Sequence, residues 1–257
     1  MGGFAFAELA IKRCLRQPSF YYFYLMPKVS KKNIIQFQNK LLTWYFLNGR
    51  KFPWRNKGLS NYQLVIAETL LQRTKAETVS KFFLGFLKTF PNWKSLATAE
   101  VAIIEEYMKP VGLYRQRAKR LQLLASEMVK RNGRLPNNRE ELESIPFLGQ
   151  YIANAIELVI FNKASPLIDV NMSRVLERYF GNRQMADIRY DPYLQDLSRK
   201  VVNHKNSKEI NWAILDFAAL ICKAQKPRCL ECPLSSKCTC FQNKESKTRL
   251  RYQQADC

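Results

Sequence analysis

Apolar residues recur at helical spacing along most of the chain. Between positions 34 and 45 the apolar side chains fall near one face of a helix that ends at Gly49. Comparable patterns predict further helices over 61–73, 75–90, 98–108, 114–131, 150–162, 171–179, 190–203 and 208–222. Alternating apolar and polar runs, which would indicate half-buried strands, are scarce. The pattern therefore predicts an all-α fold.

Residues 1–32 and 242–257 depart from this pattern. The first stretch is rich in aromatic residues, and we expect it to be a dispensable N-terminal extension. The second is polar, and we expect a frayed tail. The longest apolar run, "SFYYFYLM", is far shorter than the roughly 20 residues that span a bilayer, and the N-terminus lacks the features of a secretory signal. We therefore predict a soluble protein of the cytoplasm, with no membrane partner.

The charge of the chain indicates a polyanionic partner. Lysine and arginine number 42 against 21 acidic residues, for a formal net charge of +21, and the basic residues are spread along the whole length. Nucleic acid is the partner that this balance favours. Nonspecific binding of anionic lipid or of ribosomal RNA would need the same charge, so composition alone leaves these alternatives open.

Four cysteines near the C-terminal end have the spacing of a metal site. Cys222, Cys229, Cys232 and Cys238 follow the pattern C-x6-C-x2-C-x5-C, and Cys240 is left over. In a reducing compartment grouped cysteines more often bind metal than form disulfides. Four thiolates can hold a [4Fe-4S] cluster or a tetrahedral zinc ion. The spacing favours the cluster, because zinc ribbons usually have two C-x2-C pairs and this chain has one.

A tight turn between two predicted helices is a candidate DNA contact. One short helix ends near Ser144, Pro146 and Gly149 lie in the turn, and an apolar helix follows from Gln150. In a helix-hairpin-helix the backbone N–H groups of such a turn point at a DNA phosphate, although an ordinary helical corner has the same pattern. Asp169 then precedes another helix, where it could cap the helix or stabilise a cationic sugar during glycosidic bond cleavage.

Six motifs, in order, resemble the helix-hairpin-helix DNA glycosylases that carry an iron-sulfur cluster. They are "GRKFPWR", "AETLLQRT", "PVGLYRQRAKRL", "IPFLGQY", "LIDVN" and the four cysteines. The superfamily includes endonuclease III, the A/G-specific adenine glycosylases and the T/G mismatch glycosylases. The resemblance implies two helical lobes with a DNA-binding cleft between them. A six-helix domain with the hairpin would span 54–164, and residues 33–53 with 165–241 would form the second lobe, which holds the [4Fe-4S] cluster.

The same resemblance implies roles for single residues. Asp169 matches an Asp that the superfamily needs for catalysis. Tyr151 stands where bifunctional members have a nucleophilic Lys; a phenol cannot form an imine, so water should be the nucleophile. Glu68 matches the Glu with which adenine glycosylases protonate the departing base. Arg73 falls where relatives insert a side chain into the gap left by the flipped base, and Tyr114 lines the opposite side of that gap.

We therefore predict a monofunctional, monomeric DNA glycosylase that acts on mismatched double-stranded DNA near the nucleoid. Arg73 and the end of the chain soon after the cysteines resemble the T/G branch, which implies thymine or uracil opposite guanine as the target. The alternatives are an adenine glycosylase, which Glu68 favours, and a noncatalytic DNA-binding protein with a zinc-stabilised tail. The hairpin of the family usually reads Pro-Gly-hydrophobic-Gly. In this chain it consists of Pro146, Phe147, Leu148 and Gly149, so Phe147 stands in place of the first Gly. If that position needs a positive φ, Phe147 costs on the order of 1 kcal/mol and weakens the DNA contact.

Overall fold

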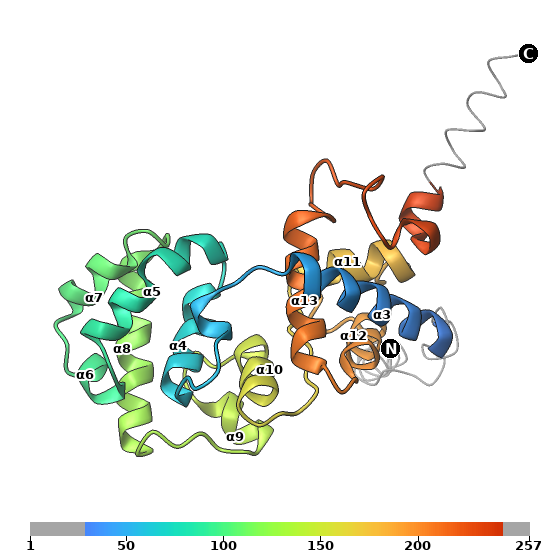
Figure 1. The fold of residues 1–257 in the computed structure, drawn as a ribbon. Helices are drawn as coiled ribbons and strands as arrows, with labels where there is room; N and C mark the ends of the chain where they lie inside the picture. The colour runs from blue at the N-terminus through green and yellow to red at the C-terminus, as the bar shows by residue number, and fades with distance from the viewer. Residues whose placement is uncertain (1–28, 244–257) are drawn as a thin grey trace, which may run out of the picture.

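The structure is a computed structural model, and it describes residues 29–243. Most of the predicted N-terminal extension, 1–32, and nearly all of the predicted tail, 242–257, lie outside the described residues. Elements are numbered as in Figure 1. None of the helices in the described part of the chain is both long and apolar enough to cross a membrane.

Within residues 29–243 the fold is built from helices and contains no strand. The α-helices are α3 (Lys31–Asn48), α4 (Asn61–Leu71), α5 (Ala76–Thr89), α6 (Trp93–Ala97), α7 (Val101–Met108), α8 (Tyr114–Lys130), α9 (Arg139–Ser144), α10 (Gln150–Val159), α11 (Val170–Phe180), α12 (Pro192–Val202) and α13 (Ser207–Leu220). Two short 3-10 helices complete the order, η1 (Pro53–Arg55) and η2 (Ser235–Lys237). The predicted all-α fold is confirmed.

One short helix was not predicted. The helix predicted over 98–108 is α7, which begins at Val101, whereas α6 lies before the predicted range and has no counterpart among the predicted helices. Helix α6 has only five residues, and Asn92 and Ser95 fix its start by bonding to each other's backbone N–H groups. A helix of this length is too short to give a recognisable hydrophobic period.

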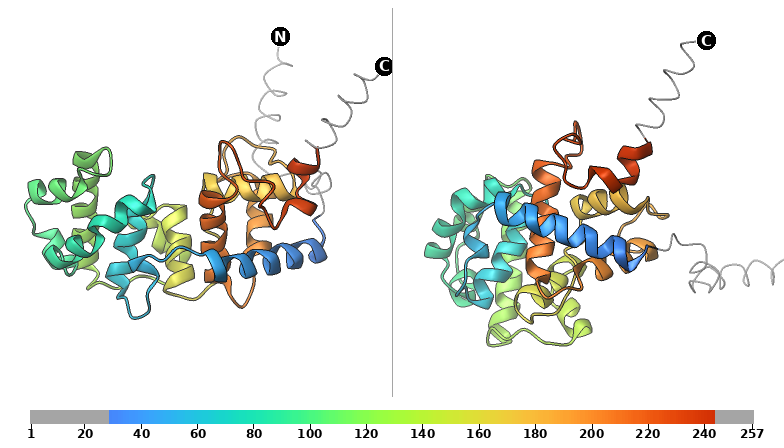
Figure 2. Two further views of the ribbon diagram at one scale, coloured as in Figure 1. Left: turned by 45° about the horizontal axis from the view of Figure 1, so that its top comes forward. Right: turned by 45° about the vertical axis from the view of Figure 1, so that its right-hand side comes forward.

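The buried apolar residues form two separate cores. The first runs from Phe52 to Ile156 and is enclosed by α4 to α10, and the second joins residues of α3 to those of α11, α12 and α13. Figures 1 and 2 show the corresponding two groups of helices from three directions, with α3 lying beside the C-terminal helices although it comes first in the chain. The domain boundaries at 54–164 and at 33–53 with 165–241 stay a prediction.

Helix α10 contributes to both cores. Ile152 and Ile156 pack into the first core, whereas Ala155 and Leu158 pack into the second. These pairs lie on different sides of the helix, because successive residues are about 100° apart around an α-helix. Helix α10 therefore lies where the two groups of helices meet.

A buried carboxylate fastens the segment between α3 and α4 to α13. Asp216 is fully buried and accepts bonds from the backbone N–H of Arg50 at 2.8 Å and from the guanidinium groups of Arg50 and Arg55. Arg55 also lies over the ring of Trp212, 5.4 Å from its centre. The two arginines neutralise Asp216 and hold the chain where it passes from the second core to the first.

Candidate active site

The side chain of Tyr151 lies between the two cores. It is partly buried and packs against residues of both. Its hydroxyl lies near the carboxylate of Glu68, which comes from α4, and acts to lower the pKa of that carboxyl. Burial raises the pKa of Tyr151 well above its usual value, and the nearby negative charges of Glu68 and Asp169 raise it further. The structure thus brings Glu68, Tyr151 and Asp169 into one site, although they come from three different elements.

Glu68 is a buried acid with an incomplete set of partners. Its side chain is 7% exposed, and its Oε2 atom has no hydrogen-bond partner. Burial raises the pKa of this carboxyl from 4.5 to about 7, while the charge of Arg55 and the hydroxyl of Tyr151 act in the opposite direction. A carboxyl group with this pKa can give or take a proton near neutral pH.

Asp169 begins helix α11 and caps it. One carboxylate oxygen accepts from the backbone N–H groups of Asn171 and Met172 at 2.9 and 2.8 Å, and the other accepts from the side-chain amide of Asn171 at 2.6 Å. The alternative interpretation as a helix cap is therefore correct, and it is compatible with a place in the site. Burial raises the pKa of Asp169, against the opposing effect of these hydrogen bonds.

Arg73 and Tyr114 lie at two turns that are fastened together. Arg73 is exposed and has a positive φ of 55°, directly after α4. Tyr114 begins α8 and is half-buried against the first core, so packing accounts for part of its ring. Arg117 connects the two turns, because its guanidinium group donates to the carbonyl oxygen of Leu70 and to the hydroxyl of Thr74, both at 2.8 Å.

Leu113, which precedes Tyr114, was not predicted from the sequence as a site residue. Its side chain is 70% exposed, and its backbone has a φ of 57°. An exposed leucine in the left-handed region is unusual, because a Cβ atom is strained there. In sequence, a leucine beside Gly112 reads as an ordinary turn or core residue, so no pattern would have identified it.

The backbone of the hairpin turn is strained at Phe147, the residue that departs from the family's usual glycine. Phe147 has a φ of 70°, and its ring is 37% exposed with the Arg120 guanidinium 5.6 Å from its centre. Leu148 is buried in the first core, and its N–H group bonds to the carbonyl of Ile145 at 3.1 Å. Pro146 and Gly149 are exposed. The outer face of the turn therefore consists of Pro146, Phe147 and Gly149.

Four cysteines line one cavity beside α11. Cys222, Cys229, Cys232 and Cys238 share it with Cys240 and with Arg178. Arg178 donates to the sulfur of Cys222 at 3.4 Å, and its carbonyl oxygen accepts from the thiol of Cys238 at 3.1 Å. Burial raises the pKa of Cys232 to about 11, so this sulfur would stay a thiol without a metal to displace its proton.

The choice between a cluster and zinc at this cavity stays a prediction from the cysteine spacing. Among residues 29–243 no group of three or more His, Cys, Asp or Glu side chains is arranged to hold a metal ion. Zinc draws four thiolates to about 2.3 Å from a single ion. An iron-sulfur cluster binds each thiolate to a different iron atom, so it needs four cysteines around one cavity, as Cys222, Cys229, Cys232 and Cys238 are.

Comparisons with known proteins agree with the family that the motifs indicate. A thymine-DNA glycosylase of Aeropyrum pernix is 36% identical over 84% of this chain and 98% of its own length. A solved structure of a thermostable thymine-DNA glycosylase superposes with a TM-score of 0.76 and 30% identity, over 82% of this chain and 98% of that one. The human adenine DNA glycosylase is 28% identical over 84% of this chain and 41% of its own length. The model of the family "HhH-GPD superfamily base excision DNA repair protein" matches residues 66–200, and the chain belongs to this superfamily.

Proposed function

We propose that the protein is a monofunctional DNA glycosylase that removes thymine or uracil from mispairs with guanine. The observation that carries this proposal is the convergence of Glu68, Tyr151 and Asp169 at the junction of the two cores. A base turned out of the duplex would enter this site, and water would replace it on the sugar. The carboxylate of Asp169 would stabilise the positive charge that develops on the sugar, or activate the water.

The absence of an amine at position 151 supports hydrolysis as the only reaction. Tyr151 lies near Glu68, and its phenol cannot form the imine through which lyases cut the DNA strand. The product would be an abasic site in an intact strand. Glu68, beside Tyr151, would bond to the edge of the base and share a proton with it as the bond to the sugar lengthens.

Basic and apolar groups around this site would hold the DNA. The net charge of +21 provides attraction to the phosphate backbone at any sequence. Arg73 and Leu113 are exposed on two joined turns, from which they would fill the space left by the flipped base. Pro146, Phe147 and Gly149 would face a phosphate, and the buried Leu148 would support them from below.

The four cysteines at the cavity beside α11 would hold a [4Fe-4S] cluster. The cluster would supply iron–thiolate bonds that keep the loop after α13 folded. Arg178 would orient Cys222 and offset the negative charge of the bound thiolate. Hydrolysis needs no electron transfer, so we assign the cluster a structural role.

The choice of base has two candidates. Similarity to the thymine-DNA glycosylases over nearly their whole length favours thymine or uracil. The raised pKa of Glu68 favours adenine instead, because a departing purine gains more from an acid that can protonate it. A panel of duplexes with T:G, U:G, A:G and A:8-oxoguanine mispairs, treated with alkali to cut abasic sites, would decide between them. No cleavage of any duplex above that of fully paired DNA would refute the proposed function.

The role of Asp169 has its own test. Asp169→Asn keeps one side-chain oxygen that can cap α11 but removes the charge, so we expect base release to fall at least 100-fold. Affinity for mismatched DNA should stay within threefold of the unsubstituted protein. Near-normal release would show that the charge of Asp169 is not needed for catalysis.

The role of Tyr151 is tested by trapping. Borohydride should not attach the protein covalently to its DNA, since no imine forms. If borohydride attaches the Tyr151→Lys variant covalently to DNA, residue 151 faces the sugar. Trapping of the unsubstituted protein would contradict the monofunctional assignment.

A further inference from the structure

The segment that leads to Asp169 is extended and has no helix or strand to satisfy its backbone groups. Helix α10 ends at Val159, and α11 begins after Asp169. Leu167 and Ile168 are buried, so water cannot replace missing hydrogen bonds along this part of the chain. The position of Asp169 therefore depends on side chains that bond to the segment from outside.

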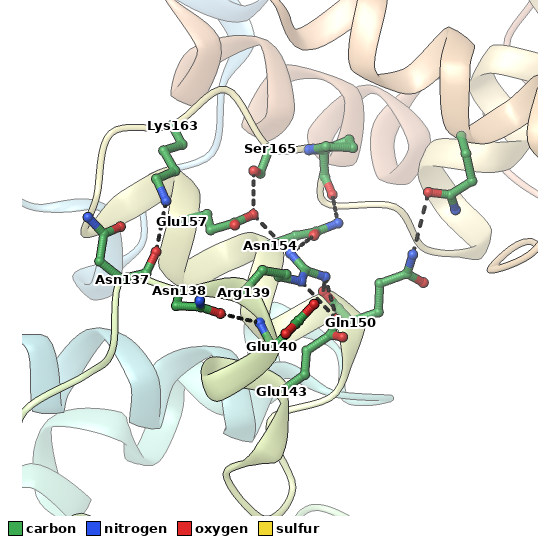
Figure 3. A network of polar contacts seen from close by, with 12 residues as sticks. Asn137, Asn138, Arg139, Glu140, Glu143, Gln150, Asn154, Glu157, Lys163 and Ser165 are labelled. Carbon is green, nitrogen blue, oxygen red and sulfur yellow. Dashed lines mark hydrogen bonds and ion pairs between the residues drawn. The ribbon is translucent and has the colours of Figure 1, made fainter. Parts of the chain in front are cut away.

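Two of these side chains come from α10. Asn154 donates from Nδ2 to the carbonyl oxygen of Pro166 at 2.7 Å, and Glu157 accepts from the hydroxyl of Ser165 at 2.7 Å. Figure 3 shows Asn154, Glu157 and Ser165 in one network. Proline has no N–H group, so the bond from Asn154 holds the single backbone polar group that Pro166 offers.

A third side chain approaches from α13. Asn211 is fully buried, and its Oδ1 atom accepts from the backbone N–H of Leu167 at 2.7 Å. Its amide nitrogen donates to the carbonyl oxygens of Ser165 and Ser207. The segment is thus held by side chains of both α10 and α13, within the four residues before Asp169.

Arg139 fixes which way the Asn154 amide points. Its Nη1 atom donates to Oδ1 of Asn154 at 2.6 Å and to Glu157 at 2.8 Å, and its Nη2 atom donates to the carbonyl of Gln150 at 3.3 Å. Because the oxygen of Asn154 faces a cation, its NH2 group must face the carbonyl of Pro166. Arg139 begins α9, so the network also joins the two helices of the hairpin.

Asn154 and Tyr151 are three residues apart on α10 and lie on the same side of the helix. We propose that Asn154, oriented by Arg139, is a positioning residue that sets the distance of Asp169 from Tyr151 and Glu68. This inference rests on the proposed function. It adds Asn154 and Arg139, which would act on the reaction through the position of Asp169. A shift of the segment would move Asp169 away from the sugar while the hairpin and its DNA contacts remain.

The test compares two buried amides that make the same kind of bond. Asn154→Leu leaves the carbonyl of Pro166 without its donor. The matched control is Gln38→Met, because Gln38 is also buried and donates from its amide to a backbone carbonyl, that of Val201, at 2.8 Å. Gln38 lies on α3 and does not contact the segment before Asp169. Both substitutions should lower the melting temperature to a similar extent.

Single-turnover base release and DNA affinity are measured at a temperature where each variant is folded. We expect release by Asn154→Leu to fall about 10- to 100-fold with DNA affinity within threefold, while Gln38→Met stays within twofold of the unsubstituted protein. Arg139→Met keeps Asn154 but no longer orients it, and should show a smaller loss of the same kind. It also provides the test if Asn154→Leu fails to fold.

Two results would overturn the inference. One is equal release by Asn154→Leu and Gln38→Met, and the other is a loss that lies in DNA affinity alone. Normal release by Asn154→Leu, beside an inactive Asp169→Asn, would refute the positioning role and leave the proposed function standing. Absence of release by the unsubstituted protein on every mispaired duplex would refute both.

Discussion

Burial of Glu68 should make the protein less stable as the pH rises. The side chain is 7% exposed, its Oε2 atom lacks a partner, and burial raises its pKa from 4.5 to about 7. Glu68→Gln keeps the shape and removes the ionisation. The difference in unfolding free energy between the two proteins, followed over pH, therefore isolates the cost of the buried charge.

The sign follows from the two pKa values. Between about pH 4.5 and about pH 7 the folded state holds a proton on Glu68 that the unfolded chain has released, so unfolding becomes more favourable as the pH rises. With 1.36 kcal/mol for each pKa unit, the cost is about 1 kcal/mol near pH 5 and about 3 kcal/mol near pH 8. The unfolding free energy of Glu68→Gln should thus rise by about 2 to 3 kcal/mol relative to that of the unsubstituted protein between about pH 5 and about pH 8.

Urea unfolding at a series of pH values measures this gain directly. Glu106→Gln is the control, because the Glu106 side chain is 64% exposed on α7 and its removal should give a nearly constant difference. A difference for Glu68→Gln that does not change between about pH 5 and about pH 8 would refute the reasoning. It would mean that Glu68 ionises in the folded protein as readily as in the unfolded chain.

Three further predictions concern other parts of the molecule. Asp216→Asn leaves the partly buried Arg55 without its counter-charge and Arg50 with only the exposed Glu77, and should lower the unfolding free energy by about 3 to 5 kcal/mol in urea; a loss below about 1 kcal/mol would contradict this. Leu113→Ala should change the unfolding free energy by less than about 0.5 kcal/mol, because the side chain is exposed, yet lower base release from duplex DNA about tenfold; equal rates would exclude insertion. Cys229→Ser should abolish iron binding and visible absorbance, measured by metal analysis and spectroscopy, and retained iron would contradict the cluster assignment.

Helical periodicity predicted most of the fold because each long helix buries one face. Helix α3 illustrates this, since Phe37 and Leu41 are fully buried on one side while Asn39 is exposed. The pattern failed where an element was too short to show a period, as in α6. It also could not show that α10 supports two cores, because the apolar positions of a helix do not indicate how many groups of neighbours they pack against.

The candidate site was less accessible to sequence reasoning. Asp169 carries a local signal, since an acidic residue before a helix predicts a cap, and the cap is present. Glu68 lies on a short helix where an isolated carboxylate reads as a solvated position, and only the family resemblance singled it out. The sequence did not single out Asn154 or Asn211. A buried asparagine on an amphipathic helix cannot be distinguished in sequence from an exposed asparagine at the edge of the polar face.

The distribution of unsatisfied groups connects the stability of the fold to its proposed chemistry. Only four buried side-chain nitrogen or oxygen atoms in residues 29–243 lack a hydrogen-bond partner, and two of them belong to Glu68 and Arg55. Arg55 is close enough to lower the pKa of Glu68, so both atoms lie in the same region. Other buried polar groups, such as Asn211, have hydrogen-bond partners, and an unmet bond in buried surroundings costs about 1 to 3 kcal/mol. The unmet bonds of Tyr193 and Ser207 belong to α12 and α13, whereas those of Glu68 and Arg55 lie where the proposed function places a flipped base. The polar edge of that base would provide partners for Glu68 and Arg55, and this would add to the free energy of binding.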